Sequence, residues 1–225
     1  MKRNITNFIA YGFIFLYTLA AILVSLNRFW QYEVFYYDFG IFDQAIWNVA
    51  HFRPPIIDHF VIPGKIIFAD HFSPSIFLLT PIYWITSRPE ALLIAQAIAV
   101  GLSALVLYRF SFSIAITVAY LLFVGTQNAL IADIHEVTFM MLPLMLTLSA
   151  IIKKQKLLFW ISFLITLGFK ESSALVGIGV AILMYKTWKK TAILVGLISI
   201  AERGGKTGLR SVDGKCCSRP DSRYG

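Results

Sequence analysis

The chain has 225 residues, of which 58% are hydrophobic and only 14% are charged. Its mean hydropathy of +0.72 lies far above that of soluble domains, so the composition excludes a soluble enzyme and predicts an all-α, multi-pass membrane protein. The net charge of +8 does not indicate a nucleic-acid partner, because the basic residues form short clusters beside apolar segments.

Apolar segments of near-spanning length predict a transmembrane region over residues 1–200. The first segment is too long for the core of a signal peptide, so we expect it to remain in the protein. A large loop over residues 27–90 follows it. The predicted spans are residues 5–26, 91–108, 112–130, 138–152, 157–169, 172–185 and an incomplete 191–200.

Charge placement predicts the orientation of these spans. Folding the chain on them puts the lysine clusters on one side and, on the other, all four histidines and every acidic residue before position 200. Because basic residues concentrate on the cytoplasmic side, the N-terminus is predicted to be cytoplasmic and the loop external. We therefore expect an integral protein of the plasma membrane, with the lipid bilayer as its partner.

The external loop is predicted to contain two helices parallel to the membrane. Residues 38–50 carry an apolar stripe at helical spacing, which would lie on the membrane surface or against the spans. Residues 73–86 are apolar but only about 21 Å long as a helix, against a hydrocarbon core of roughly 30 Å. We expect this second segment to be interfacial or re-entrant.

The last residues, 201–225, differ from the rest of the chain. They are polar, rich in glycine and arginine, and contain both cysteines. They begin where the seventh apolar segment is still incomplete. A shortened reading frame or an artificial end explains this better than a natural cytoplasmic tail, and we assign the tail no function.

Two aspartates of the first loop helix are candidate functional groups. Asp38 and Asp43 lie on the two borders of its apolar stripe. Asp38 is equally suited to capping the helix N-terminus, and Asp43 to a solvated flank. Carboxylates at a membrane surface can also act as general bases.

Further acids and histidines are predicted on the same face. Asp70 and His71 precede Ser73, which with a following proline predicts a helix start whose positive end suits a phosphate. His135 and Glu136 follow the third span. Carboxylates and imidazoles from separate segments can form a metal site, an acid/base site or ordinary surface hydrogen bonds.

Lys170 interrupts an apolar stretch together with Glu171. Charged groups at membrane depth are costly and are functional candidates. Lys170 can therefore serve a phosphate, or form an ion pair with Glu171 or another carboxylate.

Five runs resemble, in this order, a bacterial and archaeal membrane family catalogued as domain of unknown function 2079. They are YDFGIFDQAIWNVAHFRPP, DHFSPSIFLLTPIYWI, LLIAQAIAVGLSALVLYRF, DIHEVTF and GFKESSAL, and the resemblance extends over about residues 5–185. The family is considered related to the GT-C type of membrane glycosyltransferases. The resemblance implies a GT-C-like fold and a lipid-linked donor, a polyprenyl-phosphate sugar, used at the external face.

The resemblance also implies roles for the candidate residues. The catalytic base would be Asp38 or Asp43. The phosphate partners would be Lys170, His71, Arg53 and Ser73, and a divalent metal ion, if one is used, would be held by Asp70, His135 and Glu136. Family members usually run longer, so an inactive fragment is an alternative, as is a transporter that uses the external Asp and His groups with a buried Lys–Glu pair.

Overall fold

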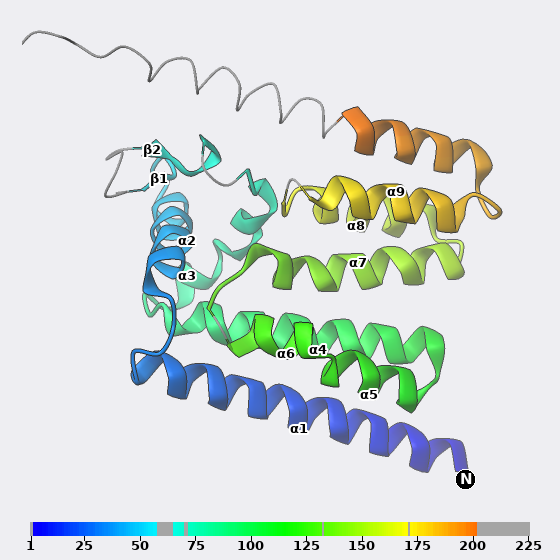
Figure 1. Cartoon of the computed structure of the whole chain (residues 1–225), viewed down its shortest axis with the longest axis horizontal. Coiled ribbons are helices and arrows are strands. Elements are labelled where there is room, and N and C mark those ends of the chain that lie inside the picture. Colours follow the sequence, from blue (N-terminus) through cyan, green and yellow to red (C-terminus); the bar gives the residue numbers. More distant parts are fainter. Residues whose placement is uncertain (1, 58–64, 70–71, 132, 171, 202–225) are drawn as a thin grey trace, which may run out of the picture.

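The structure is a computed structural model that describes residues 2–57, 65–69, 72–131, 133–170 and 172–201. It consists of a row of nearly parallel helices with the loop region folded across one end (Figure 1). Within the described ranges, the sole strand pairing joins β1 (Ile56–Ile57) and β2 (Lys65–Ile66). The prediction of an all-α membrane protein is confirmed.

The helices divide into those of the row and those of the loop. The row contains α1 (Lys2–Trp30), α4 (Glu90–Ser111), α5 (Ile114–Leu122), α6 (Val124–Ile131), α7 (Glu136–Ile152), α8 (Lys156–Leu167), α9 (Ser173–Met184) and a last helix over residues 189–201. The loop contains α2 (Tyr36–Ala50), α3 (Ile82–Ile85) and the 3-10 helices η1 (Ile67–Ala69) and η2 (Pro74–Leu79). Helices thus occupy all seven segments predicted as spans.

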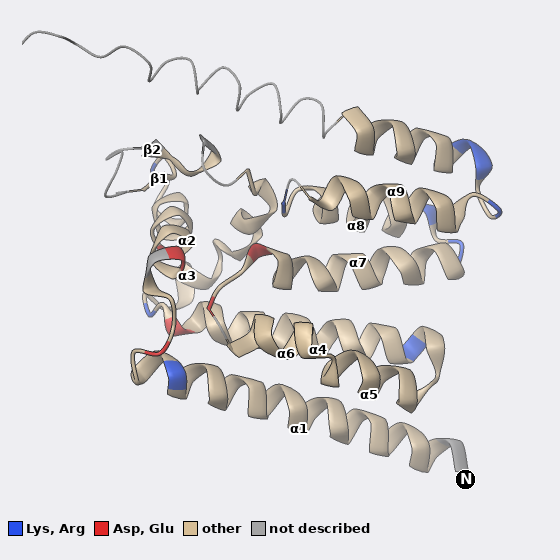
Figure 2. Ribbon diagram, in the orientation of Figure 1, with Lys and Arg blue, Asp and Glu red and all other residues tan. Residues whose placement is uncertain are grey.

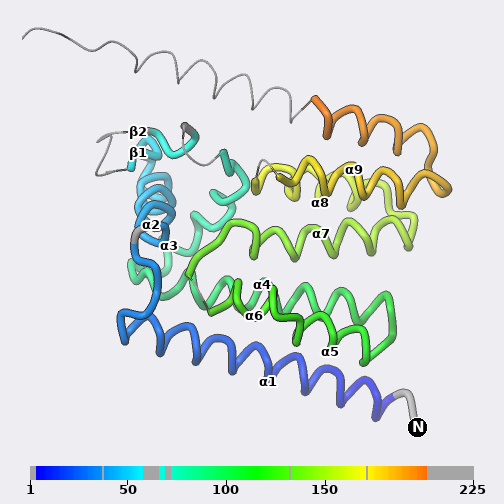
Figure 3. Tube along the Cα trace, viewed as in Figure 1, coloured from blue at the N-terminus to red at the C-terminus, as the bar shows by residue number. Residues whose placement is uncertain are grey.

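The helices differ in whether they are long and apolar enough to cross a membrane. In the described part of the chain, α1 and α4 are each long and apolar enough to cross a membrane. Helices α5 and α6 qualify together as one span bent by 50° at Phe123, whose backbone is extended (Figure 3). Helices α7, α8 and α9 have 17 residues or fewer. A passage through the bilayer by all seven segments stays a prediction.

Close packing orders the row. Helix α4 lies between α1 and α7, and α7 packs on α8. At the α1–α4 contact, a Cβ on Gly101 would stand 2.2 Å from Thr18 Oγ1. The absence of a side chain at position 101 therefore lets the two backbones approach, as small residues do between membrane helices.

Helix α2 lies across the end of the row rather than along it (Figure 1). Phe42 and Ile46 of its apolar stripe are 1% and 0% exposed, and they belong to a core with Ile134, Phe139 and Phe169 from the ends of the row helices. Of the two positions that the sequence allowed for α2, the structure shows packing against the row helices. Its direct neighbours are β1, η2 and α3 of the loop, and its buried residues share one core with residues from the ends of the row helices.

The second loop segment is not one helix. It forms η2 and the single turn of α3, because Pro81 has no N–H to continue a helical hydrogen-bond ladder. Ser75 ties η2 to α8: its N–H donates to the carbonyl of Gly168 (2.9 Å) and its hydroxyl to that of Ile165 (2.8 Å).

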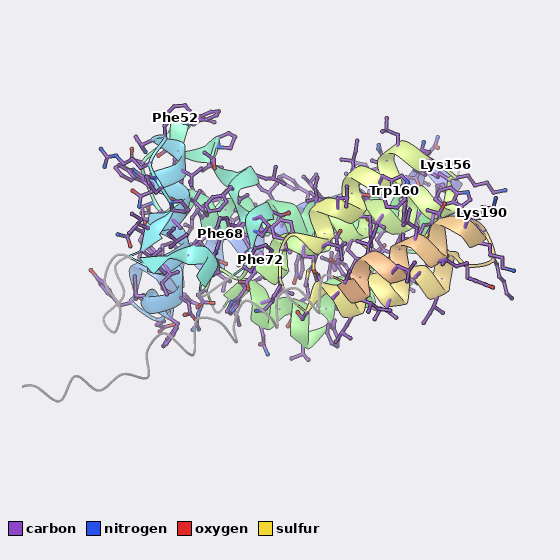
Figure 4. The ribbon with its side chains drawn as sticks, turned by 90° about the horizontal axis from the view of Figure 1, so that it is seen from above. Phe52, Phe68, Phe72, Lys156, Trp160 and Lys190 are labelled. Carbon is purple, nitrogen blue, oxygen red and sulfur yellow. The ribbon has the colours of Figure 1, made fainter. Side chains whose placement is uncertain are left out.

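The two ends of the row differ in charge. The described acidic residues gather at the end that α2 covers, whereas the opposite end carries Arg109 and lysine clusters (Figure 2). We call these the acidic end and the lysine-rich end. Figure 4 shows Lys156 and Lys190 at the lysine-rich end and Phe52 at the far side of the molecule. Residues 202–225 lie outside the described part, so the structure does not address the polar tail.

Candidate functional site at the acidic end

Asp38 is a carboxylate available at the start of α2. The N-cap position belongs to Phe35, without a side-chain cap, so the alternative of Asp38 as N-cap is wrong. Asp38 lies in the first helical turn, where the helix dipole favours a negative charge. Its side chain is partly exposed and makes no hydrogen bond or ion pair with the residues that the structure describes. A substrate can therefore reach it.

Asp43 is held by a tyrosine of the second loop segment. The hydroxyl of Tyr83, in α3, donates a short hydrogen bond to Asp43 Oδ1. Burial raises the pKa of Asp43, the hydrogen bond from Tyr83 acts in the opposite direction, and the charge of Glu90 raises it further. Burial and the same hydrogen bond raise the pKa of Tyr83, so the phenol keeps its proton. Asp43 is therefore more basic than an ordinary aspartate and fixes α3 to α2.

Gln96 organises the segment between α6 and α7. From the second turn of α4, its side chain donates to the backbone carbonyl of Asp133 (2.9 Å) and accepts from the backbone N–H of His135 (3.1 Å). His135 Nε2 lies 2.8 Å from Asp133 Oδ1. This hydrogen bond, with the nearby negative charges, raises the pKa of His135, although burial and Lys170 lower it. The imidazole thus stays protonated to a higher pH than usual.

Glu136, the first residue of α7, forms an ion pair with Lys170, which lies between α8 and α9. Lys170 Nζ lies 3.0 Å from Glu136 Oε1, and the side chains are 36% and 3% exposed. The hydroxyl of Ser173 donates to the carbonyls of Lys170 (2.5 Å) and Leu167 (2.7 Å), which fixes the turn before α9. An ammonium carries three N–H donors, so Lys170 retains N–H groups beyond the one that Glu136 accepts.

The predicted phosphate partners of the loop differ in their surroundings. Arg53 lies beyond the far end of α2, with its guanidinium 5.3 Å from the ring centroid of Trp47. Ser73 is 2% exposed and makes no capping hydrogen bond, and the 3-10 helix that follows it has only six residues. Ser73 is therefore buried rather than set on an open helix terminus. His71 lies outside the described residues.

Two of the predicted metal ligands are each paired with another side chain. His135 is bonded to Asp133 and Glu136 to Lys170, while Asp70 lies outside the described residues. Over the described ranges, no three His, Cys, Asp or Glu side chains are placed to hold a metal ion. The metal site stays a prediction, and the function proposed below uses no metal.

Two contributors were missed by the sequence analysis. Gln96 is a polar residue inside a predicted span and is 1% exposed, so its position alone was a signal. Tyr83 lies in the apolar loop segment, where nothing in the sequence indicated its pairing with Asp43.

Comparison with known proteins identifies the family of the chain. Residues 28–202 match the family described as predicted membrane protein (DUF2079). The chain belongs to this family. Its matched range includes the whole acidic-end site, from α2 to Lys170. No curated protein and no solved structure matches the chain.

Proposed function

We propose that this DUF2079 protein is a glycosyltransferase-like membrane protein that moves a sugar from a polyprenyl-phosphate donor to an acceptor at the acidic end. The observation that carries the proposal is the ion pair between the buried Glu136 and the partly exposed Lys170, at the end that also bears Asp38, which has no partner among the described residues. The positive-inside rule supports an external acidic end and a cytoplasmic lysine-rich end in the plasma membrane.

The base of this reaction would be a carboxylate of α2. Asp38 takes the proton of the acceptor hydroxyl while the acceptor oxygen forms a bond to the anomeric carbon of the sugar. The bond from that carbon to the phosphate oxygen breaks, and its electron pair leaves with the lipid phosphate. The exposure of Asp38 and its lack of partners among the described residues support this role. The raised pKa of Asp43 suits a base too, but its bond to Tyr83 favours a positioning role.

The cation that receives the leaving phosphate would be Lys170. Its charge would compensate the negative charge that develops on the phosphate oxygen. Glu136, almost fully buried, holds the ammonium in place, and the remaining N–H groups can point to the substrate. His135, protonated to a higher pH than usual, adds positive charge near Lys170.

The test uses purified protein in lipid and a panel of polyprenyl-phosphate sugars. We expect Asp38→Asn to lower the turnover of one donor by roughly 10²–10⁴-fold, the usual contribution of a general base. Glu33→Gln is the matched control, because Glu33 is an exposed acid that pairs with Arg28 at the same end. Equal turnover of Asp38→Asn and the wild-type protein would overturn the role of Asp38.

A transporter is the second candidate, favoured by one observation. The Asp133–His135 and Glu136–Lys170 pairs are close enough to influence each other's charge, as groups of a proton relay would be. A transporter would show solute or proton flux in vesicles that Glu136→Gln abolishes and Asp38→Asn leaves intact. The glycosyltransferase proposal requires the opposite result for Asp38→Asn in the transfer assay.

A further inference from the structure

A furrow of about 380 Å³ follows the seam between α1 and α4. Its walls are apolar and include Phe15, Ile98 and Leu102, and its floor contains the close contact of Thr18 with Gly101. Because α1 is the edge helix of the row (Figure 1), the furrow opens on the side of the helices. In a bilayer this surface faces lipid.

The length of the furrow corresponds to one leaflet. Ile98 and Arg109, which line its two ends on α4, are eleven residues apart, or about 16 Å at 1.5 Å per residue. Half of a hydrocarbon core is about 15 Å thick. An acyl chain with its headgroup at Arg109 therefore fits along the furrow.

The charged residues beside the furrow favour a lipid with an anionic headgroup. Arg109 is exposed in the last turn of α4 and has no carboxylate within ion-pair distance in the described part of the protein. No acidic residue lines the furrow. A smaller hollow of about 210 Å³ at the acidic end of the same seam is lined by both Arg88 and Glu90, and the negative charge of Glu90 disfavours an anion there.

We propose that the α1–α4 furrow binds one anionic phospholipid from the leaflet at the lysine-rich end, with its phosphate on Arg109 and an acyl chain against Ile98 and Leu102. The binding does not depend on the enzymatic activity proposed above. Guanidinium groups bind phosphates well, and basic residues at the membrane surface attract anionic headgroups.

The test places the full chain in phosphatidylcholine nanodiscs that contain a small fraction of photoactivatable phosphatidylglycerol. After illumination, mass spectrometry maps the label, which we expect on α1 and α4. Arg109→Gln should lower this labelling about fivefold, the equivalent of ~1 kcal/mol for one basic residue at a membrane surface. Leu102→Trp, which fills the furrow, should lower labelling by photoactivatable phosphatidylglycerol and phosphatidylcholine alike.

Matched controls separate a built site from general surface charge. Lys156→Gln removes an exposed charge at the same end, and Leu164→Trp enlarges an exposed apolar residue on α8. Both should label like the wild-type protein. Equal losses in Lys156→Gln and Arg109→Gln, label outside α1 and α4, or a disulfide-linked dimer of Leu102→Cys in a protein whose Cys216 and Cys217 are both replaced by serine would each overturn the proposal.

Discussion

The charged side chains at the two ends of the helix row differ in their exposure and in their pairing. At the lysine-rich end, the side chains of Lys156 and Lys190 are exposed, and neither forms an ion pair within the described residues (Figure 4). At the acidic end, Glu136 is 2% exposed and paired with Lys170. Taking charges out of water is costly, so only the acidic end requires a specific arrangement of partners. The exposed lysines at the lysine-rich end are suited to setting the orientation of the protein in the membrane. The paired charges at the acidic end are suited to a functional site.

The largest expected difference between the ends comes from removing one lysine at each. Lys170→Met leaves the buried Glu136 unpaired and should lower the free energy of unfolding by about 2–3 kcal/mol. Lys190→Met should change it by less than about 0.5 kcal/mol, because that side chain is solvated. Denaturant unfolding in detergent micelles measures both.

A double variant tests whether the unpaired charge of Glu136 causes this loss of stability. Adding Glu136→Met to Lys170→Met removes the stranded charge and should recover most of the lost stability. Equal effects of the two single lysine variants would show that the pair contributes no more than surface charge.

Two glycines give the next largest difference. Gly168→Ala would place a Cβ 2.2 Å from Ser75 Oγ and 3.4 Å from its backbone nitrogen, so it should destabilise the protein by about 1–3 kcal/mol. Gly179 in α9 has open space around it, so Gly179→Ala should stabilise the helix by up to about 1 kcal/mol. Opposite shifts of the thermal unfolding midpoint are expected, and shifts of the same sign would contradict the docking of η2 on α8.

The smallest expected effect is a pH dependence confined to the acidic end. The pKa of His135 is raised above its ordinary value of 6.5, first by the hydrogen bond with Asp133. The folded protein then holds this proton to a higher pH than the unfolded chain does. The stabilisation is fully present below about pH 6.5 and is lost as the pH rises through the folded-state pKa.

Asp133→Asn tests this dependence, because it removes the charged partner of His135. The free energy of unfolding should then decline less as the pH rises above about 6.5. His135→Gln should remove the same part of the decline. An unchanged pH profile in both variants would contradict the assignment to His135.

Helix positions and the stripe of α2 were predictable from the sequence, because both are local. Composition and apolar segment length predicted the helices of the row. The apolar stripe of α2 was predicted at Phe35, Phe39, Phe42, Ile46 and Val49, of which Phe39, Phe42 and Ile46 are buried, whereas Phe35 is 62% exposed. The break between η2 and α3 was missed, although Pro81 was a visible signal.

The site was predicted in its residues but not in its pairings. Lys170 was expected either to bind a phosphate or to pair with Glu171 or another carboxylate, and the structure joins it to Glu136, 34 residues earlier. The metal site was grouped from residue types alone, whereas Asp133 and Lys170 are the observed partners of His135 and Glu136. Such pairings depend on how α4, α7 and α8 pack, which apolar periodicity does not specify.

The hydrogen bonds of Ser75 to the α8 end also constrain how the protein is made. Ser75 and its acceptor on Ile165 are 90 residues apart in the chain. At about 5–20 residues per second, the ribosome completes the acceptor segment roughly 5–20 s after the loop has emerged. During that interval α2 can pack on η2 and α3, but Ser75 lacks both of its acceptors, so the acidic end is complete only after α8 has been made.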